Sequence, residues 1–440
     1  MEIVHSKKEK LRARLREKFF AGHNGKPSIL IFGLGLSGGG VGAARFFAEL
    51  GYSVTVTDAK PKTQLVASLH ALRSYPIKYV LGRHRKKDFA RADLVVKNPG
   101  IPKTNRYLKS AKRITNDAEI FLALAPHART IGVTGTKGKT TTTMLIKHFL
   151  GKRAALVGVP GVSFLDYFFL SREPQWIVAE FSSFDLEYVR TSPHVAVVTS
   201  LFADHLNRYV SFSAYARAKM NIVRFQKKGD YAFLWKSLAV KWHCPRMLGT
   251  QIWVCDNKEF SVPWNISRHS AFLAYTVAHS LGVKRKDLVK KIKMFRPARG
   301  RLEIVVKRKG NIFINDTTAT NPGAAAFSTL TLVKKYPKAV VITGGEDKNI
   351  PLKDVLAYAR VLRACKVSVV ILPGSFSDKL VRILSVPYEL ARSMDDAVKR
   401  ACGKGTVIAL IPGAASFNMF ANEFDRGDSF IRAARQCGVS

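Results

Sequence analysis

Acidic residues are scarce in this chain of 440 residues. Asp and Glu together number 31 against 72 Lys and Arg, which gives a formal net charge of +41. Such a charge attracts nucleotides, polyanions and anionic surfaces over long range but does not select among them. The basic residues are spread through the whole sequence, with no interleaved aromatic platform and no nucleic-acid motif. We therefore interpret them as a solvated basic surface and predict no dedicated nucleic-acid site.

Long apolar runs and paired cysteines are missing as well. No stretch approaches the roughly 18 apolar residues that span a bilayer, and the N-terminus MEIVHSKKEKLRARLREK is charged where a signal peptide needs an apolar segment. The five cysteines are odd in number and form no CxxC pair. They predict reduced thiols, without a disulfide framework or a thiolate zinc site. Together these absences indicate a cytoplasmic protein.

The basic extension, residues 1–27, carries Leu11, Leu15 and Phe19 at helical spacing. One interpretation is a helix that packs on the rest of the protein. The alternative is a helix that associates weakly with an anionic membrane surface.

Three α/β domains are expected from the order of strands, glycine loops and helices. Residues 28–125 begin with the strand SILIFG, a helix and the strand YSVTVTD, which is a βαβ unit typical of a Rossmann-like domain. The cycle restarts within residues 126–297, a central P-loop domain of the ATPase type. A second Rossmann-like domain follows at 298–440, with strands at NIFIND, AVVITGG, VSVVILPG and TVIALIPG.

The first glycine loop follows the strand SILIFG. Gly33, Gly35 and Gly38 would let backbone N–H groups and a helix N-terminus approach a pyrophosphate, and Asp58 could hold a ribose hydroxyl. Taken alone, this loop is typical of NAD binding, or of a tight turn between a strand and a helix.

The second loop, GVTGTKGKTT at 132–141, is more specific. Its N–H groups and Lys139 can neutralise β- and γ-phosphate oxygens, and the Thr140 hydroxyl can bind Mg²⁺. It departs from the strict P-loop spacing because Val133 stands in place of the first glycine. The residues expected to bind ATP here are Gly135, Thr136, Lys137, Gly138, Lys139, Thr140 and Thr141. Hydride transfer does not require ATP, so two phosphate loops argue against a dehydrogenase.

Nine motifs occur in an order that resembles the Mur ligase family, a relative of the folylpolyglutamate synthases. The resemblance is closest to the members that add D-glutamate to UDP-N-acetylmuramoyl-L-alanine. It implies an ATP- and Mg²⁺-dependent amide ligase of peptidoglycan precursor synthesis that works through an acyl phosphate. The motifs are FGLGLSG with VTVTD, NPGIP, GVTGTKGKTT, AEFSSFDLE, DHLNRYVSFSAYARAKMNI, RLE, NDTTATNP, GGEDKNIP and IPGAASFNMFANEFDRGDSF.

The resemblance also implies roles for individual residues around the metal. Glu180 would hold Mg²⁺ with Thr140, His205 would lie near a second Mg²⁺, and Lys219 would carry a carbamate that assists metal binding. Lys139, His205 and Lys219 are the predicted catalytic residues. Without the motifs, His205 would be as readily a residue capping a strand end, and Lys219 a solvated charge.

Substrate contacts follow from the same resemblance. Arg301 and Asp316 would reach ATP, so the third domain should close over the second. We expect a monomer. The residues that would hold the UDP-sugar are Gly35, Leu36, Ser37, Gly38 and Asp58. Those that would hold D-glutamate are Thr320, Lys348, Ser416 and Phe424, the last offset by one position from the usual pattern.

Several positions depart from the family pattern, and they leave alternatives open. The chain could be a ligase of the same superfamily with another amino acid or acceptor, or a weakly catalytic phosphate-binding module with an anionic polymer or membrane partner. An NAD-dependent oxidoreductase rests on the first loop alone. The departing positions are Val159, Pro160, Ser267, Ser270, Gly300 and Thr318.

Overall fold

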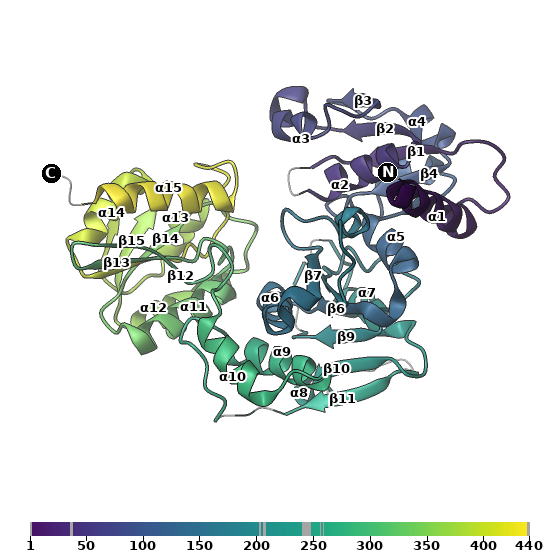
Figure 1. Cartoon of the computed structure of the whole chain (residues 1–440). Helices are drawn as coiled ribbons and strands as arrows, with labels where there is room; N and C mark the ends of the chain where they lie inside the picture. The colour runs from purple at the N-terminus through teal and green to yellow at the C-terminus, as the bar shows by residue number, and fades with distance from the viewer. Residues whose placement is uncertain are drawn as a thin grey trace. The chain divides into compact units, whose positions relative to one another are not determined.

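The computed structural model of the chain contains two compact units (Figure 1). The first comprises residues 1–260 and 268–292, and the second comprises residues 261–267 and 293–440. The first unit holds two β-sheets and the second unit holds one, so the predicted three-domain α/β fold is confirmed. The structure describes residues 2–35, 38–201, 204–205, 208–239, 248–255, 257 and 259–437, with side chains from residue 6 onward.

The first sheet is fully parallel, with strand order β3-β2-β1-β4-β5. Its central strand β1 is a continuous apolar run with both faces covered, as parallel sheets require. The strands are β1 (Ser28–Phe32), β2 (Ser53–Asp58), β3 (Ile77–Leu81), β4 (Leu94–Lys97) and β5 (Ile114–Thr115). The helices are α2 (Gly39–Glu49), α3 (Val66–His70), α4 (Lys86–Arg91) and α5 (Asp117–Leu124).

Helix α1 (Glu2–Phe19) packs on the first unit. Leu11, Leu15 and Phe19 are buried, and the basic side chains around them bind acceptors of the same unit. Arg12, for example, donates from Nε to the Leu50 carbonyl at 2.8 Å. The packing interpretation is therefore confirmed, whereas membrane association stays a prediction.

The second sheet is also parallel, in the order β11-β10-β9-β6-β8-β7. Its strands are β6 (Thr130–Thr134), β7 (Ala154–Val157), β8 (Trp176–Glu180), β9 (Val195–Val198), β10 (Tyr231–Trp235) and β11 (Thr250–Val254). The helices are α6 (Lys139–Leu150), α7 (Phe212–Arg224), α8 (Lys236–Ala239), α9 (Arg268–Ser280) and α10 (Arg285–Met294). Because β6 lies between β9 and β8, the loop that follows it is flanked by the ends of both neighbours.

The third sheet has the order β12-β13-β17-β14-β15-β16, with only β12 antiparallel to its neighbour. Helices α11, α12 and α13 cover one face, and α14 and α15 cover the other. In Figure 1, α11 and α12 lie below the strands of this sheet and α15 lies above them. The strands are β12 (Glu303–Arg308), β13 (Asn311–Asn315), β14 (Val340–Gly344), β15 (Ser368–Leu372), β16 (Tyr388–Leu390) and β17 (Val407–Leu410). The helices are α11 (Pro322–Lys335), α12 (Leu352–Ala364), α13 (Ser375–Val381), α14 (Met394–Cys402) and α15 (Glu423–Gln436).

One expectation about cysteines is wrong. Cys402 and Cys437 form a disulfide between the C-terminal ends of α14 and α15, although reduced thiols were expected. The two cysteines are 35 residues apart, and only the packing of α14 against α15 brings them together. Cys255 and Cys365 are free, as expected, and Cys244 lies outside the described residues.

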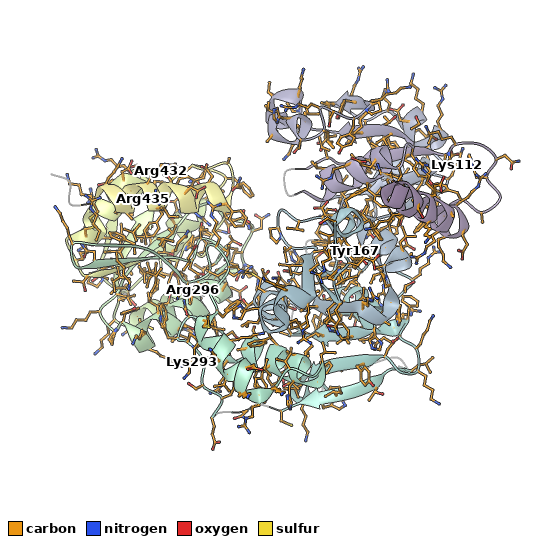
Figure 2. All side chains as sticks on the ribbon, in the orientation of Figure 1. Lys112, Tyr167, Lys293, Arg296, Arg432 and Arg435 are labelled. Atoms are coloured by element: carbon orange, nitrogen blue, oxygen red, sulfur yellow. A yellow bond between two sulfur atoms is a disulfide. The ribbon has the colours of Figure 1, made fainter. Side chains whose placement is uncertain are left out.

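The surface is rich in basic side chains. Figure 2 shows long side chains with nitrogen ends on both units, among them the exposed residues Lys112, Lys293, Arg296, Arg432 and Arg435. This distribution agrees with a solvated basic surface. Within the described part of the chain, none of the helices has the length and apolar character that crossing a bilayer demands.

Candidate functional site

The second glycine loop connects β6 to α6 as predicted. Gly138 adopts φ +83° immediately before α6, a left-handed conformation that favours glycine. At Gly135, with φ +149°, a Cβ would lie 2.0 Å from Thr199 Oγ1. The glycines are therefore needed both for the conformation of the loop and for its close approach to the end of β9.

Residues after β9 fix the conformation of this loop. The Thr136 N–H donates to the Ser200 carbonyl and the Lys137 N–H to Ser200 Oγ, both at 2.9 Å. The Thr199 hydroxyl donates to the Lys137 carbonyl at 2.6 Å. These contacts hold the loop at the N-terminus of α6, where the helix dipole favours an anion.

Two lysines converge on the loop from different helices. Lys139 Nζ, at the start of α6, donates to the Thr136 carbonyl at 3.3 Å, and Lys219 Nζ, in α7, donates to the Gly135 carbonyl at 2.8 Å. Only 1% of Lys219 is exposed. Burial, followed by the nearby Lys139 ammonium, places the pKa of Lys219 well below its ordinary value. The structure thus brings the two lysines to one loop, while their catalytic roles stay predictions.

The predicted magnesium residues Thr140 and Glu180 also meet. Thr140 Oγ1 donates to Glu180 Oε1 at 3.1 Å, from the first turn of α6 to the end of β8. Both side chains are buried. A hydroxyl and a carboxylate are hard oxygen ligands beside a phosphate loop, so these residues fit Mg²⁺.

His205 lies near this group, in a left-handed conformation with φ +53°. Its ring packs against Phe184 and Tyr215, and the Tyr215 hydroxyl donates to Thr136 Oγ1 at 3.1 Å. Burial is the main cause that lowers the pKa of His205, and it outweighs the opposing charge of Asp204. His205 is therefore neutral over a wider pH range than a free histidine, and a neutral imidazole can accept a proton or a metal.

The first glycine loop follows β1 as predicted. Asp58, which was expected to hold a ribose hydroxyl, instead binds backbone N–H groups of this loop. Asp58 Oδ2 accepts the N–H groups of Leu34 and Gly35, at 2.8 and 3.2 Å. The carboxylate therefore fixes the loop itself, and its contact with a ribose stays a prediction. Gly38, with φ +95°, begins α2 as expected. Leu36 and Ser37 lie outside the described residues.

A buried ionic cluster beside this loop was missed from the sequence. Lys97, at the end of β4, is fully buried, and burial lowers its pKa to about 8 against the opposing charge of Glu187. Asp117, at the start of α5, has a pKa raised to about 7 by burial and by Asp185. A narrow cavity between β4, α2 and α5 is lined by Lys97, Asn98 and Asp117. The sequence feature that could have indicated this cluster is the lysine at the end of the apolar strand LVVK.

In the second unit, the predicted ATP residues Arg301 and Asp316 are neighbours. Asp316 Oδ1 accepts the Leu302 N–H at 3.0 Å. Burial raises the pKa of Asp316 to about 7, although the Arg301 charge opposes this shift. Asp316 can therefore hold a proton near neutral pH. Contact of either residue with ATP stays a prediction.

The predicted D-glutamate residues gather at one edge of the third sheet. Thr320 follows β13, Lys348 follows β14 and Ser416 follows β17, three adjacent strands. A bridge between Glu346 and Ala415 ties two of these loops together. Ligands of open α/β sheets bind at this carboxyl edge. The three residues therefore lie where the topology of the sheet favours a ligand, while their contacts with D-glutamate stay predictions.

Phe424 and Arg426 show how α15 begins at this edge. The Arg299 guanidinium lies 5.8 Å from the centre of the Phe424 ring. Arg426, which the sequence analysis missed, is buried, and its guanidinium donates to the carbonyls of Thr317, Ala414 and Ala415 at 2.9–3.1 Å. This arginine joins the loops after β13 and β17, and its place in the motif EFDRGDSF was the signal available.

Two of the departing positions contact each other. Thr318 Oγ1 donates to the Gly300 carbonyl at 2.8 Å, and Gly300 adopts φ +70°. A Cβ at Gly300 would lie 2.8 Å from Thr317 Cγ2. Both the left-handed conformation and the close approach of Thr317 therefore favour glycine at position 300.

Of the remaining departures, Val159, Pro160 and Ser270 lie in the first unit. Val159 and Pro160 form a turn in which the Val162 N–H donates to the Val159 carbonyl at 2.9 Å. Val159 and Pro160 offer no side-chain amide in this turn. Ser270, in α9, lies against the phosphate loop, because a Cβ at Gly138 would be 2.8 Å from its Oγ. Ser267 lies in the second unit.

Comparisons with known proteins agree with this architecture. A family model described as Mur ligase middle domain matches residues 133–243, and one described as Mur ligase MurD-like, N-terminal domain matches residues 27–120. The UDP-N-acetylmuramoylalanine–D-glutamate ligase of Roseiflexus sp. is 33% identical, over 92% of this chain and 97% of that protein. The ligase of the same name from Borreliella burgdorferi is 32% identical, over 93% and 98%.

Solved structures support the same fold. The UDP-N-acetylmuramate–alanine ligase of Thermotoga maritima has a TM-score of 0.64 at 20% identity, over 93% of this chain and 99% of that one. A MurF ligase from the same organism, solved in complex with ADP, has a TM-score of 0.59 at 15% identity, over 87% and 95%. With relatives above 30% identity along nearly its whole length, the chain belongs to the Mur ligase family.

Proposed function

We propose that this chain is an ATP-dependent ligase that joins D-glutamate to the L-alanine carboxylate of UDP-N-acetylmuramoyl-L-alanine. The observation that carries the proposal is the group around the second glycine loop, where Lys139, Lys219, Thr140 and Glu180 meet at the N-terminus of α6. Similarity to two named D-glutamate ligases over more than nine-tenths of the chain supports the choice of substrates.

The reaction has two steps. An oxygen of the alanine carboxylate attacks the γ-phosphorus of ATP, the bond to the β–γ bridging oxygen breaks, and ADP leaves. The amine of D-glutamate then attacks the acyl carbon, inorganic phosphate leaves, and the nitrogen loses a proton. The N–H groups of the loop and the Lys139 ammonium stabilise charge on the phosphoryl oxygens, so the protein acts by positioning and electrostatics.

Mg²⁺ would neutralise the negative charge of the ATP phosphate oxygens and would be bound by carboxylate groups of the protein. Thr140 and Glu180 would hold one ion, and His205 with Lys219 would serve a second. A carbamate on Lys219 requires a neutral amine, and the lowered pKa of Lys219 supplies it. The modification would replace an ammonium that repels a cation with an anion that attracts one.

Lys97 and Asp117 are suited to the acceptor side of the reaction. Lys97 points to the carbonyls of Asn98 and Ile101, at 3.2 and 2.8 Å, beside the first glycine loop. A buried cation there would favour an anionic substrate group over water. Lys348, an exposed cation at the edge of the third sheet, would pair with a carboxylate of D-glutamate. The reaction belongs to peptidoglycan precursor synthesis in the cytoplasm, where ATP is available.

A panel of amino acids tests the proposal. The purified protein is given ATP, Mg²⁺ and UDP-N-acetylmuramoyl-L-alanine, and phosphate release is compared among D-glutamate, L-glutamate, D-aspartate and glycine. D-Glutamate should give the fastest release, and Lys139→Ala should lose at least about 100-fold in rate. Lys152→Ala, an exposed lysine beyond the end of α6, is the control. Faster release with another amino acid overturns the choice of D-glutamate.

A further inference from the structure

Three polar residues gather at the edge of the second sheet that lies opposite the phosphate loop. His127 precedes β6, His194 precedes β9 and Asp230 precedes β10, and these three strands are neighbours in the sheet. The phosphate loop follows β6 at its other end. One strand length of five residues, about 16 Å, therefore separates this group from the ATP site.

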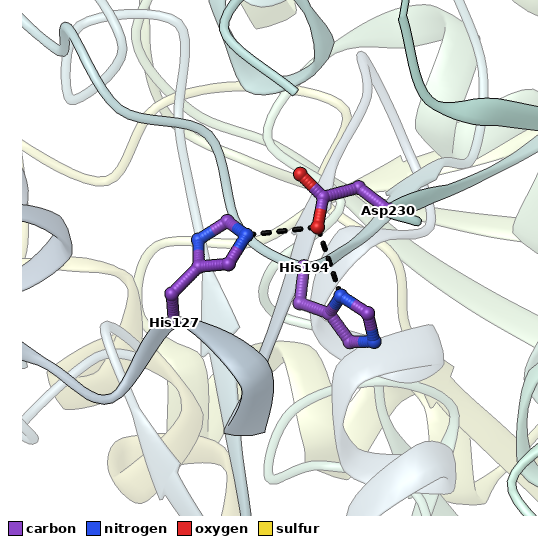
Figure 3. Close-up of side chains that lie close together, drawn as sticks. All are labelled: His127, His194 and Asp230. Atoms are coloured by element: carbon purple, nitrogen blue, oxygen red, sulfur yellow. Dashed lines mark hydrogen bonds and ion pairs between the residues drawn. The ribbon is translucent and has the colours of Figure 1, made fainter. Parts of the chain in front are cut away.

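The three side chains point to a common centre (Figure 3). His127 Nε2 lies 2.8 Å and His194 Nδ1 lies 2.9 Å from the same oxygen of Asp230, Oδ1. The Asp230 side chain is 4% exposed, whereas those of His127 and His194 are 33% and 23% exposed. The aspartate is therefore shielded from solvent, whereas solvent reaches both imidazole rings.

Neighbouring groups fix each of the three residues. Asp230 Oδ2 accepts the Lys227 N–H at 2.7 Å, which orients the carboxylate. The His127 carbonyl accepts the Thr130 hydroxyl at 2.6 Å, and the His194 carbonyl accepts the Tyr231 N–H at 2.8 Å. The carboxylate of Asp230 is therefore oriented before an ion binds, whereas the two histidines are held through their main chains and their rings can rotate.

We propose that His127, His194 and Asp230 form a binding site for one divalent cation of the zinc class. Two imidazole nitrogens and a carboxylate oxygen, with a fourth position open to water, are a donor set that zinc accepts in tetrahedral geometry. Mg²⁺ prefers an all-oxygen octahedral shell and fits poorly. The site is thus distinct in position and in ligand chemistry from the magnesium residues of the phosphate loop.

Cation binding requires a small rearrangement. Tetrahedral ligands at zinc distances lie about 3.3 Å from one another, slightly farther than the hydrogen-bonded atoms lie here. Rotation of the two partly exposed rings supplies the difference. Each neutral imidazole moves its proton to the ring nitrogen that faces away from the ion. The ion then replaces two hydrogen bonds and joins the starts of β6, β9 and β10.

The consequence is a stabilising metal site in the central domain that takes no part in the reaction. A ligand that binds only the folded state raises the free energy of unfolding in proportion to the logarithm of its concentration. Zn²⁺ should therefore raise the thermal midpoint of the first unit.

The test uses full-length protein without a histidine tag, freed of metal with a chelator and titrated with Zn²⁺ in the absence of ATP. We expect one equivalent to bind with a dissociation constant on the order of micromolar, and Co²⁺ to give the visible spectrum of a tetrahedral site. His127→Gln with His194→Gln should lose this equivalent, the cobalt spectrum and the thermal shift. His205→Gln should keep all three, because His205 lies at the phosphate loop.

Several outcomes would contradict the proposed zinc site. The proposal is wrong if Zn²⁺ up to about 1 mM gives no saturable binding, or if the double variant binds as tightly as the native chain. If the double variant does not fold, the single variant His127→Gln replaces it, since this side chain is one-third exposed. Loss of binding in His205→Gln instead would assign the equivalent to the catalytic group and overturn the site.

Discussion

Thr140 donates a hydrogen bond from its hydroxyl to Glu180 at 3.1 Å, although the two residues are 40 positions apart. One begins α6 and the other ends β8, the strand next to β6. The parallel sheet therefore brings a hydroxyl and a carboxylate together at the carboxyl edge, beside the phosphate loop. The fold thus positions the two residues that we propose as ligands of Mg²⁺.

Replacing Glu180 by glutamine keeps the acceptor oxygen and removes the negative charge. We expect Glu180→Gln to fold and to need roughly 10- to 100-fold more Mg²⁺ for half-maximal phosphate release. Glu173→Gln is the matched control, because Glu173 is exposed and its ion pair with Arg129 lies at the surface. An unchanged magnesium requirement in Glu180→Gln would remove this residue from the metal site.

Asp93 should make stability depend on pH in the acid range. Burial alone would raise its pKa, but hydrogen bonds from Ser28 and Lys112 lower it to about 2 from 3.8. Because the folded pKa is depressed, the stabilisation is present above pH 4 and is lost as pH falls toward 2. Asp93→Asn should cost about 2 kcal/mol at neutral pH and little at pH 2.

Denaturant unfolding at a series of pH values measures this effect. Asp287→Asn, at an exposed position in α10, serves as the control and should lower stability by less than about 0.5 kcal/mol at every pH. A difference between Asp93→Asn and the native chain that stays constant from pH 7 to pH 2 would contradict the assignment.

Alanine substitutions at Gly300 and Gly310 distinguish the energetic cost of backbone strain from that of a steric clash. Both adopt positive φ, but a Cβ meets Thr317 at 2.8 Å at Gly300 and nothing within 4 Å at Gly310. We expect Gly310→Ala to lose about 1 kcal/mol and Gly300→Ala to lose at least about 1 kcal/mol more. Chemical denaturation of the two variants compares them directly, and equal losses would show that the neighbouring threonine yields without cost.

Arg426 should contribute strongly to the stability of the second unit. Its guanidinium is buried and satisfies three carbonyls. Arg426→Met should cost about 3 kcal/mol, because these carbonyls lose their donors at a buried position. Arg432→Met, on the exposed side of the same helix (Figure 2), should change the free energy of unfolding by less than about 0.5 kcal/mol. Similar losses in both variants would contradict the role of Arg426.

The features predicted best from the sequence are those coded locally. The phosphate loop follows from the spacing of Gly135 and Gly138 with Lys139 and Thr140, because a strand, a glycine turn and a helix N-terminus are contiguous in the chain. The alternation of apolar strands with helices likewise predicted parallel α/β sheets. Helix α1 had two interpretations; the burial of Leu15 confirms that the helix packs on the protein, and membrane association stays a prediction.

Features that depend on long-range proximity could not be predicted. Cys402 and Cys437 meet only because α14 packs against α15, and Lys97 meets Asp117 only through the contact of β4 with α5. Asp58 was predicted to hold a ribose hydroxyl; it accepts backbone N–H groups of the loop, a role that spacing alone cannot distinguish from ribose binding. Such contacts depend on the order of strands in the sheet and on helix packing, and a single sequence motif does not determine either.

Product mass most directly tests the central claim that the terminal phosphoryl group of ATP activates a carboxylate for attack by D-glutamate. The protein is incubated with UDP-N-acetylmuramoyl-L-alanine, ATP, Mg²⁺ and D-glutamate, with both carboxylate oxygens of the alanine labelled with ¹⁸O, so that one label passes to phosphate and the other stays in the amide carbonyl. We predict a product heavier by one glutamyl residue and transfer of the label to inorganic phosphate. Phosphate released without label, or without any conjugate, would contradict the account.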